Sequence, residues 1–282
     1  MCNPDTPKLK HCHPHPSEDD NTRETREAFK RVEKLYHYTS VQAACLILSS
    51  NKLRFGALKK MNDINEVYRR KCYPERLSET NIEDKFEKEL SKYKQLSFTQ
   101  DTPQKAGYDI PAMWGHYADR GCGVCLVFDK AKLLQQLKPE MARRSVQYTP
   151  DFNENIFTDE NIKESLQKYE KEYFFTKTQD WAYEQEWRVL VCSEEEPTYL
   201  DLADSLIAII LNFAPDVTHE DSVFNSENSR LLEKIVPKIP ILEYGMFCGK
   251  ANLRDKDANE WRKNCIFALT MPVSILCLMP TL

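Results

Sequence analysis

Short runs of apolar, β-branched and aromatic residues recur along this chain between charged stretches, and this alternation limits the folds open to it. Two charged stretches, 82–95 and 160–175, have the period of helices with a solvated face. The pattern predicts an α+β fold with mixed sheets and helical insertions. The runs with the length and composition of strands are LYHYT (35–39), KLRFG (52–56), GVCLVFD (123–129), EWRVLVC (186–192), SLIAIIL (205–211) and IPILEY (239–244).

A helix is predicted directly after the first strand. Ser40 has the side chain of a good N-cap, because its oxygen can accept from an amide of the first turn. The residues that follow at the spacing of one buried helix face are Val41, Ala44, Cys45 and Leu48. LYHYT, this helix and KLRFG therefore form a strand–helix–strand unit.

The composition is that of a globular protein. The 282 residues are 41% hydrophobic and 29% charged. The formal net charge of −5 does not favour electrostatic binding of the whole protein to nucleic acid or to an anionic membrane. Ten cysteines are spread from Cys2 to Cys277 without a compact pattern, and the first 20 residues contain no hydrophobic stretch after their basic residues. We therefore expect a cytoplasmic protein with reduced thiols.

Three regions are predicted along the chain. Residues 1–30 are polar and proline-containing and predict a weakly ordered tail, in which HCHPHP (His11–Pro16) is a solvated run, not a metal site. Residues 31–245 form the main domain, and 246–282 a C-terminal extension packed on it. Residues 265–282 carry no charge, but Pro272 and Pro280 favour buried strands and turns over a membrane span, so no stable membrane association is expected.

Two clusters along the chain combine histidine with aromatic residues. In an extended LYHYT, His37 and Thr39 share one face and offer a donor and an acceptor to a polyol. MWGHYADRGCGVCLVFD (113–129) joins aromatic residues to a glycine turn, a composition that suits a pocket for a flat ring. Only seven glycines occur in the chain, and four of them fall between Gly107 and Gly123. A histidine bonded within the core and a well-packed aromatic turn remain open as structural alternatives.

A third cluster carries carboxylates. If EQEWRVLVC is extended, Glu184, Glu186 and Arg188 lie on one face of a strand whose other face is core. A carboxylate in such a position can bind a sugar hydroxyl or face a developing oxocarbenium ion. A salt-bridged strand face is the structural alternative.

These segments together resemble a bacterial domain family of unknown function, over residues 35–245. The matching segments are LYHYT (35–39), MNDINE (61–66), LSFT (96–99), MWGHYA (113–118) and WAYEQEWR (181–188). That family in turn looks like a distant relative of the ADP-ribosyltransferases of the His-Tyr-Glu branch, which includes the DNA-modifying DarT toxins. The resemblance implies split mixed β-sheets and NAD as the cofactor.

Roles follow from this resemblance and not from the spacing of the residues. His37 and Thr39 are similar to the residues that bind ribose and nicotinamide, and Tyr117 to an aromatic residue that stacks on nicotinamide. Glu186 is similar to the catalytic glutamate, and Glu184 to a residue that orients the acceptor. The remaining residues expected at the NAD site are Tyr38, Ser97, Trp114, His116 and Arg188.

The resulting hypothesis is an enzyme that transfers ADP-ribose from NAD to a protein or nucleic acid, with a toxin or phage-defence role implied by the family alone. A first alternative is an inactive ligand- or partner-binding module of the same fold, in which the cleft is occluded or Glu186 is held in a closed ion pair with Arg188. A second is a metal-dependent hydrolase or nuclease that uses Asp63, Glu66 and His116, although their spacing is not that of a recognisable metal site.

Overall fold

The computed structural model describes residues 29, 31–58, 61–63, 80–150, 162–212, 219–247 and 250–255. The chain divides into a segment up to Val32 and a compact unit from Glu33 onward, and the sheets lie in the second unit. The HCHPHP run and the apolar segment 265–282 lie outside the described residues. None of the helices within those ranges is long and apolar enough to cross a bilayer.

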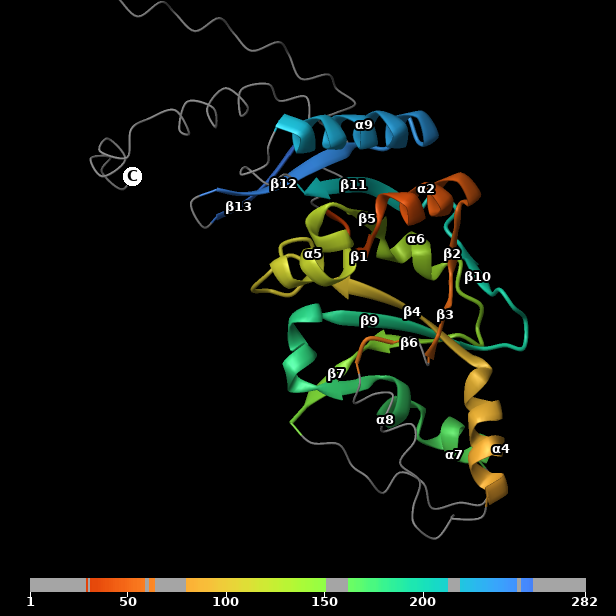
Figure 1. Ribbon diagram of the computed structural model, residues 1–282. Coiled ribbons are helices and arrows are strands. Elements are labelled where there is room, and N and C mark those ends of the chain that lie inside the picture. Colours follow the sequence, from red (N-terminus) through yellow and green to blue (C-terminus); the bar gives the residue numbers. More distant parts are fainter. Residues whose placement is uncertain are drawn as a thin grey trace, which may run out of the picture. The chain divides into compact units, whose positions relative to one another are not determined.

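One mixed sheet forms the centre of the fold (Figure 1). Neighbouring strands are antiparallel except β11 and β12, which are parallel, so the predicted mixed sheet is confirmed. The last two strands that the structure describes continue this sheet beyond the predicted domain boundary at residue 245. Within the described residues, its order is β13 (Lys250–Asp255), β12 (Ile241–Phe247), β11 (Leu206–Asn212), β5 (Val124–Asp129), β1 (Lys34–Thr39), β4 (Tyr93–Gln100), β9 (Glu186–Cys192) and β6 (Ala142–Ser145), with β3 (Gly56–Ala57) paired to β4.

The sheet consists of two halves that are joined weakly at β1 and β4. Strand β1 pairs with β5 along its whole length, from Lys34 to Thr39. Its pairing with β4 is limited to Leu35 and Tyr36. The sheet is therefore continuous by its hydrogen bonds, whereas the resemblance implies separate sheets. From His37 onward, however, β1 no longer pairs with β4.

Two small sheets and several helices surround this centre. The small sheets pair β10 (Tyr199–Asp201) with β2 (Lys52–Arg54), and β7 (Gln147–Thr149) with β8 (Thr176–Thr178). The predicted charged helix at 82–95 ends at Ser91, and its last residues instead begin β4. The helices are α2 (Val41–Ser50), α4 (Thr80–Ser91), α5 (Pro111–Tyr117), α6 (Lys130–Leu134), α7 (Ile162–Lys168), α8 (Glu170–Phe174) and α9 (His219–Ile235), with 3-10 turns η3 (Asp119–Gly121) and η4 (Gln179–Glu184).

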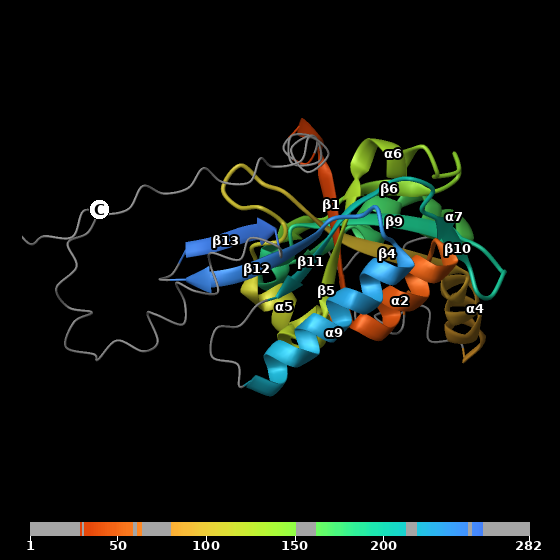
Figure 2. The same cartoon turned by 90° about the horizontal axis from the view of Figure 1, so that it is seen from above.

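The predicted helix after the first strand is confirmed. Ser40 caps α2 by accepting from the amide of Ala43 at 3.2 Å. Helices α2 and α9 lie side by side on the sheet (Figure 2). The buried face of α2 and Leu232 of α9 join the core with Leu96, Phe98 and Trp187 from β4 and β9. These alternate positions put one face of β4 and β9 in the core and leave the other face for polar residues.

The predicted glycine cluster is explained by close packing at two positions. A Cβ at Gly123 would lie 2.3 Å from the carbonyl oxygen of Thr39, so only glycine lets β5 approach β1 there. A Cβ at Gly107 would lie 2.4 Å from the ring of Tyr36. Gly115 has open space around it. Gly107 and Gly123 are thus required by close packing, and Gly115 is not.

Candidate functional site

A cavity of about 290 Å³ lies between β1 and β4, where these strands are no longer paired. Strand β4 contributes five consecutive residues to its wall, and β1 contributes three. The cavity therefore forms where the two halves of the sheet separate. Its lining residues are Tyr36, His37, Tyr38, Arg54, Gly56, Met61, Asn62, Gln95, Leu96, Ser97, Phe98, Thr99, Met113, Tyr117, Lys177, Glu184 and Glu186.

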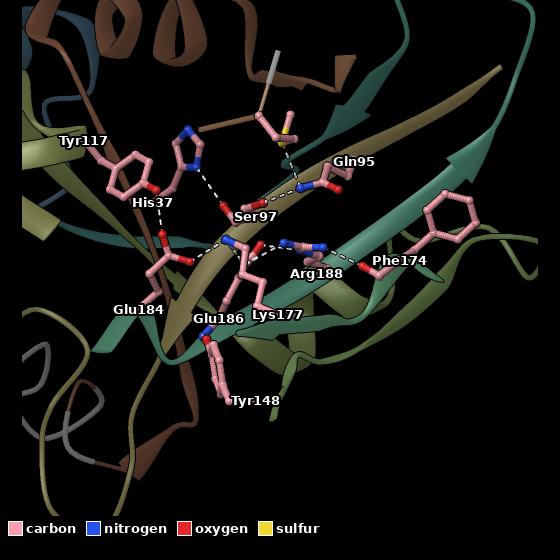
Figure 3. Close-up of polar contacts among 11 residues, drawn as sticks. His37, Gln95, Ser97, Tyr117, Tyr148, Phe174, Lys177, Glu184, Glu186 and Arg188 are labelled. Carbon is pink, nitrogen blue, oxygen red and sulfur yellow. Dashed lines mark hydrogen bonds and ion pairs between the residues drawn. The ribbon is translucent and has the colours of Figure 1, made fainter. Parts of the chain in front are cut away.

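The two predicted carboxylates line this cavity, but not from one extended strand (Figure 3). Glu184 ends the 3-10 turn η4 and Glu186 begins β9. Gln185 between them has left-handed backbone angles, φ 48° and ψ 45°, and ends the 3-10 turn directly before the strand. The expectation of an extended Glu-x-Glu pair is thus wrong, because a turn, and not the strand period, brings the two side chains together. Glu184 and Glu186 are 3% and 4% exposed.

Glu186 is held as an anion by two cations. Its Oε1 accepts from Nε of Arg188 at 2.5 Å, and its Oε2 accepts from Nη2 of Arg188 and from Nζ of Lys177, each at 2.9 Å. Arg188 is itself buried and donates through Nη1 to the carbonyl of Phe174 at 2.5 Å. Burial disfavours the charged carboxylate, but Arg188 and Lys177 outweigh burial and hold the pKa of Glu186 well below its usual range.

Glu184 has the opposite electrostatic environment. Its Oε1 accepts from the hydroxyl of Tyr117 at 2.5 Å, and its Oε2 accepts from Nζ of Lys177 at 2.6 Å. Burial raises the pKa of Glu184, Lys177 opposes that rise, and the negative charge of Glu186 adds to it. Two neighbouring carboxyl groups with pKa values displaced in opposite directions can divide into one permanent anion and one group that exchanges a proton.

His37 is a neutral histidine with a defined tautomer. Its Nδ1 lies 3.2 Å from the carbonyl oxygen of Ser97, which can only accept, so Nδ1 carries the proton. Burial lowers the pKa of His37. The neutral ring leaves Nε2 as an acceptor on a residue that lines the cavity. The strand divergence therefore exposes to the cavity a histidine that the core would otherwise cover.

The predicted site residues divide into two groups. Six of the ten line the cavity, and four do not. Trp114 packs in the core, where it stacks on Tyr244 at 5.3 Å and donates to the carbonyl of Tyr108 at 2.9 Å. His116 is exposed, Thr39 at the end of β1 does not line the cavity, and Arg188 contacts Glu186 without lining it. The six that line the cavity are His37, Tyr38, Ser97, Tyr117, Glu184 and Glu186.

Sequence reasoning missed several further lining residues, and three of them, Lys177, Gln95 and Thr99, are buried and polar. Lys177 of β8 contacts both carboxylates, although nothing in its local sequence distinguishes it from a surface lysine. Gln95 and Thr99 flank Ser97 on alternate positions of β4 and are 3% and 1% exposed. The sequence does contain a signal for Gln95 and Thr99, because polar residues alternate with Leu96 and Phe98 in a strand that is otherwise buried.

The described residues contain no group of three or more histidine, cysteine or acidic side chains arranged to hold a metal ion. Of the residues in the hydrolase alternative, Asp63 is buried and does not line the cavity, His116 is exposed, and Glu66 lies outside the described residues. The ion pair expected from the binding-module alternative, between Glu186 and Arg188, is present together with the cavity.

Comparison with known proteins shows that part of this site is similar to an uncharacterised family. Residues 113–189 match the family described as "Protein of unknown function (DUF2971)". The matched segment, about a quarter of the chain, contains MWGHYA, Lys177 and WAYEQEWR. The searches of curated proteins and of solved structures found no match for the chain. None of these comparisons links it to the ADP-ribosyltransferases.

Proposed function

We propose that the protein cleaves the bond between nicotinamide and ribose in NAD and transfers ADP-ribose to a macromolecule. One observation carries the proposal: His37, Tyr117, Glu184 and Glu186, from three distant segments, line one cavity in which the two carboxylates have opposite pKa shifts. The sheet, nearly divided between β1 and β4, is compatible with the split-sheet architecture of ADP-ribosyltransferases. The proposal rests on the cavity and on the sequence resemblance together.

The residues of the cavity fit the nicotinamide end of NAD. Tyr36, Tyr38 and Tyr117 supply aromatic walls, and His37 and Ser97 supply neutral polar groups. A volume of about 290 Å³ is at the low end of small-molecule pockets, which span about 300–1,000 Å³. The cavity therefore has room for one end of NAD and not for the whole dinucleotide.

Glu186 acts in this proposal as a fixed negative charge. NAD supplies an ADP-ribosyl group, whose bond to nicotinamide breaks with the electron pair leaving on the nicotinamide nitrogen. Positive charge then develops on the ribose carbon, and a preorganised anion beside it lowers the barrier. Arg188 and Lys177 keep Glu186 ionised and immobile for that purpose.

Glu184 acts as the general base for the acceptor. A carboxylate has about four lone-pair positions; Arg188, Lys177 and a hydrogen bond from Ser97 engage those of Glu186. Among the described residues, Glu184 has two partners, Tyr117 and Lys177, so it retains acceptor positions. The acceptor's nucleophilic atom bonds to the ribose carbon, and its proton passes to Glu184. A raised pKa suits that role.

The test is release of nicotinamide from NAD by the purified protein, with and without cell extract. Glu184→Gln is expected to lower the rate by about 10²–10⁴-fold, the usual effect of losing a general base. Glu194→Gln is the matched control, because Glu194 is an exposed glutamate outside the cavity. If the wild type releases no nicotinamide and NAD fails to raise its melting temperature, the proposal is wrong.

The closed ion-pair network supports a second candidate, a binding module of the same fold without turnover. Glu186 is fully engaged by its protein partners, as expected of a structural carboxylate. This candidate predicts that NAD raises the melting temperature while no nicotinamide is released. It further predicts that Glu184→Gln leaves this thermal protection intact.

A further inference from the structure

A stripe of polar side chains follows one face of β4 at the bottom of the cavity. Gln95, Ser97 and Thr99 occupy alternate positions, whereas Leu96 and Phe98 between them face the hydrophobic core. Gln95 and Thr99 are almost completely buried, at 3% and 1% exposed. Buried polar groups in a central strand are costly unless they are hydrogen-bonded.

Two atoms of this stripe have no partner among the described residues. They are Oε1 of Gln95 and Oγ1 of Thr99. The amide nitrogen of Gln95 is engaged, since Nε2 donates to Oγ of Ser97 at 3.1 Å and to Sδ of Met61 at 3.0 Å (Figure 3). These bonds fix the amide and leave Oε1 as an unused acceptor. More than nine-tenths of such buried groups in proteins are paired, so two on one face of β4 point to a ligand.

The rim of the same cavity carries a positive charge that no described residue neutralises. Arg54 of β2 lines the cavity and is exposed, and it forms no ion pair with any residue that the structure describes. It lies two residues before Gly56, which pairs with Gln95 across the sheet. The other lining cation, Lys177, is neutralised by Glu184 and Glu186. A guanidinium matches the geometry of a phosphate group through paired hydrogen bonds.

We propose that Gln95, Thr99 and Arg54 form a subsite for a ribose phosphate. Gln95 accepts from, and Thr99 exchanges a hydrogen bond with, hydroxyl or amide groups of the ligand inside the cavity, and Arg54 binds the phosphate at the rim. Because it rests on the proposed function, this inference identifies the nicotinamide mononucleotide half of NAD as the part that enters the cavity. The adenosine half then stays outside.

Binding of three probes by calorimetry tests the subsite: nicotinamide mononucleotide, nicotinamide riboside, which lacks the phosphate, and AMP. The mononucleotide is expected to bind at least 10-fold more tightly than either of the other two. Arg54→Gln abolishes the preference over the riboside, and Arg54→Lys keeps part of it. Lys52→Gln is the matched control, because it removes one positive charge from the same strand outside the cavity.

The polar stripe is tested by substitutions that keep side-chain volume. Gln95→Leu and Thr99→Val are expected to weaken the mononucleotide and the riboside equally, by about 10-fold each, because they remove contacts that both ligands share. Unchanged affinity in both variants overturns this part of the inference, most clearly if Gln95→Leu also stabilises the free protein.

The outcomes separate this inference from the proposed function. Arg54-dependent binding of the mononucleotide without nicotinamide release from NAD supports the subsite and refutes the enzyme. Nicotinamide release with the same KM for NAD in Arg54→Gln and in the wild type supports the enzyme and refutes the phosphate contact. Equal affinity for mononucleotide and riboside in the wild type, or no binding of either, overturns the inference.

Discussion

Replacement of Lys177 by methionine tests the charge arrangement of the site most directly. The ammonium of Lys177 lies 2.6 Å from Oε2 of Glu184 and 2.9 Å from Oε2 of Glu186, and the lysine side chain is 7% exposed. Lys177→Met keeps most of the side-chain volume and removes the charge. It leaves two buried carboxylates beside each other, of which only Glu186 retains a cation, Arg188.

The size of the effect follows from these distances. At an effective dielectric constant of about 20, each lysine–carboxylate contact is worth about 6 kcal/mol before desolvation is subtracted. Removing one partner of a buried ion pair lowers the free energy of unfolding by about 3–5 kcal/mol, because the remaining charge stays buried without compensation. We expect a loss of this size for Lys177→Met at pH 8.

The loss is expected to shrink at lower pH. Burial already raises the pKa of Glu184, and removal of Lys177 raises it further. Between the unfolded and folded pKa values of Glu184, the folded protein binds more protons than the unfolded chain, so the free energy of unfolding falls as pH rises. As the pH is lowered, Glu184 takes up a proton in Lys177→Met more readily than in the wild type, which relieves the repulsion by about 1.4 kcal/mol per unit of pKa change.

Urea unfolding at pH 5 and pH 8 measures this difference. The double variant Lys177→Met/Glu184→Gln is expected to recover stability at pH 8 and to lose the pH dependence, because the carboxyl group that titrates is gone. Lys52→Met, on an exposed strand residue, controls for loss of a lysine charge. Equal losses at both pH values, or a double variant less stable than Lys177→Met at pH 8, would refute the reasoning.

Three further predictions concern the scaffold and the reaction. Gly123→Ala is expected to lower the free energy of unfolding by about 3 kcal/mol in urea melts, because its Cβ would meet a β1 carbonyl at 2.3 Å, whereas Gly115→Ala, with open space, is neutral or stabilising. Ser40→Ala is expected to cost about 1 kcal/mol through loss of the α2 cap, and Ser50→Ala, at the exposed end of that helix, much less; equal losses contradict the capping role. The rate of nicotinamide release is expected to rise with pH as Glu184, whose pKa is raised, loses its proton. If the residual activity of Glu184→Gln has the same pH profile, Glu184 is not the general base.

Local sequence was sufficient for the six segments predicted as strands, each of which contains a strand of the structure. EWRVLVC forms β9 with the predicted bounds, and the helix after Ser40 begins and is capped as predicted. Such segments are decided by short-range properties: the side-chain period, the N-cap hydroxyl and β-branched composition. The start of β4 was mispredicted as helix, because charged residues near Lys94 continue a helical period. Lys94 is nevertheless only 2% exposed, with its ammonium bonded to backbone carbonyls beyond β9.

The candidate site was predictable only in its residue types. Histidine, tyrosine and paired glutamates in aromatic surroundings indicated a polar pocket, and six of the ten expected residues line one cavity. Trp114 could not be told apart from a pocket residue, because its partner Tyr244 is 130 positions away in the chain. The left-handed conformation of Gln185, which converts a strand-like Glu-x-Glu into a turn, could not be predicted from the sequence either.

The sequence by itself thus determined the strands and helices that have a clear hydrophobic period or a cap, because these signals act over a few residues. The tertiary structure decided where β1 and β4 part, and with that the place of the cavity and the exposure of His37 to it. It also brought Lys177 between Glu184 and Glu186 and set Arg188 behind them. Charges act over distances in space and not along the chain, so the protonation of these carboxyl groups depends on contacts that exist only after folding.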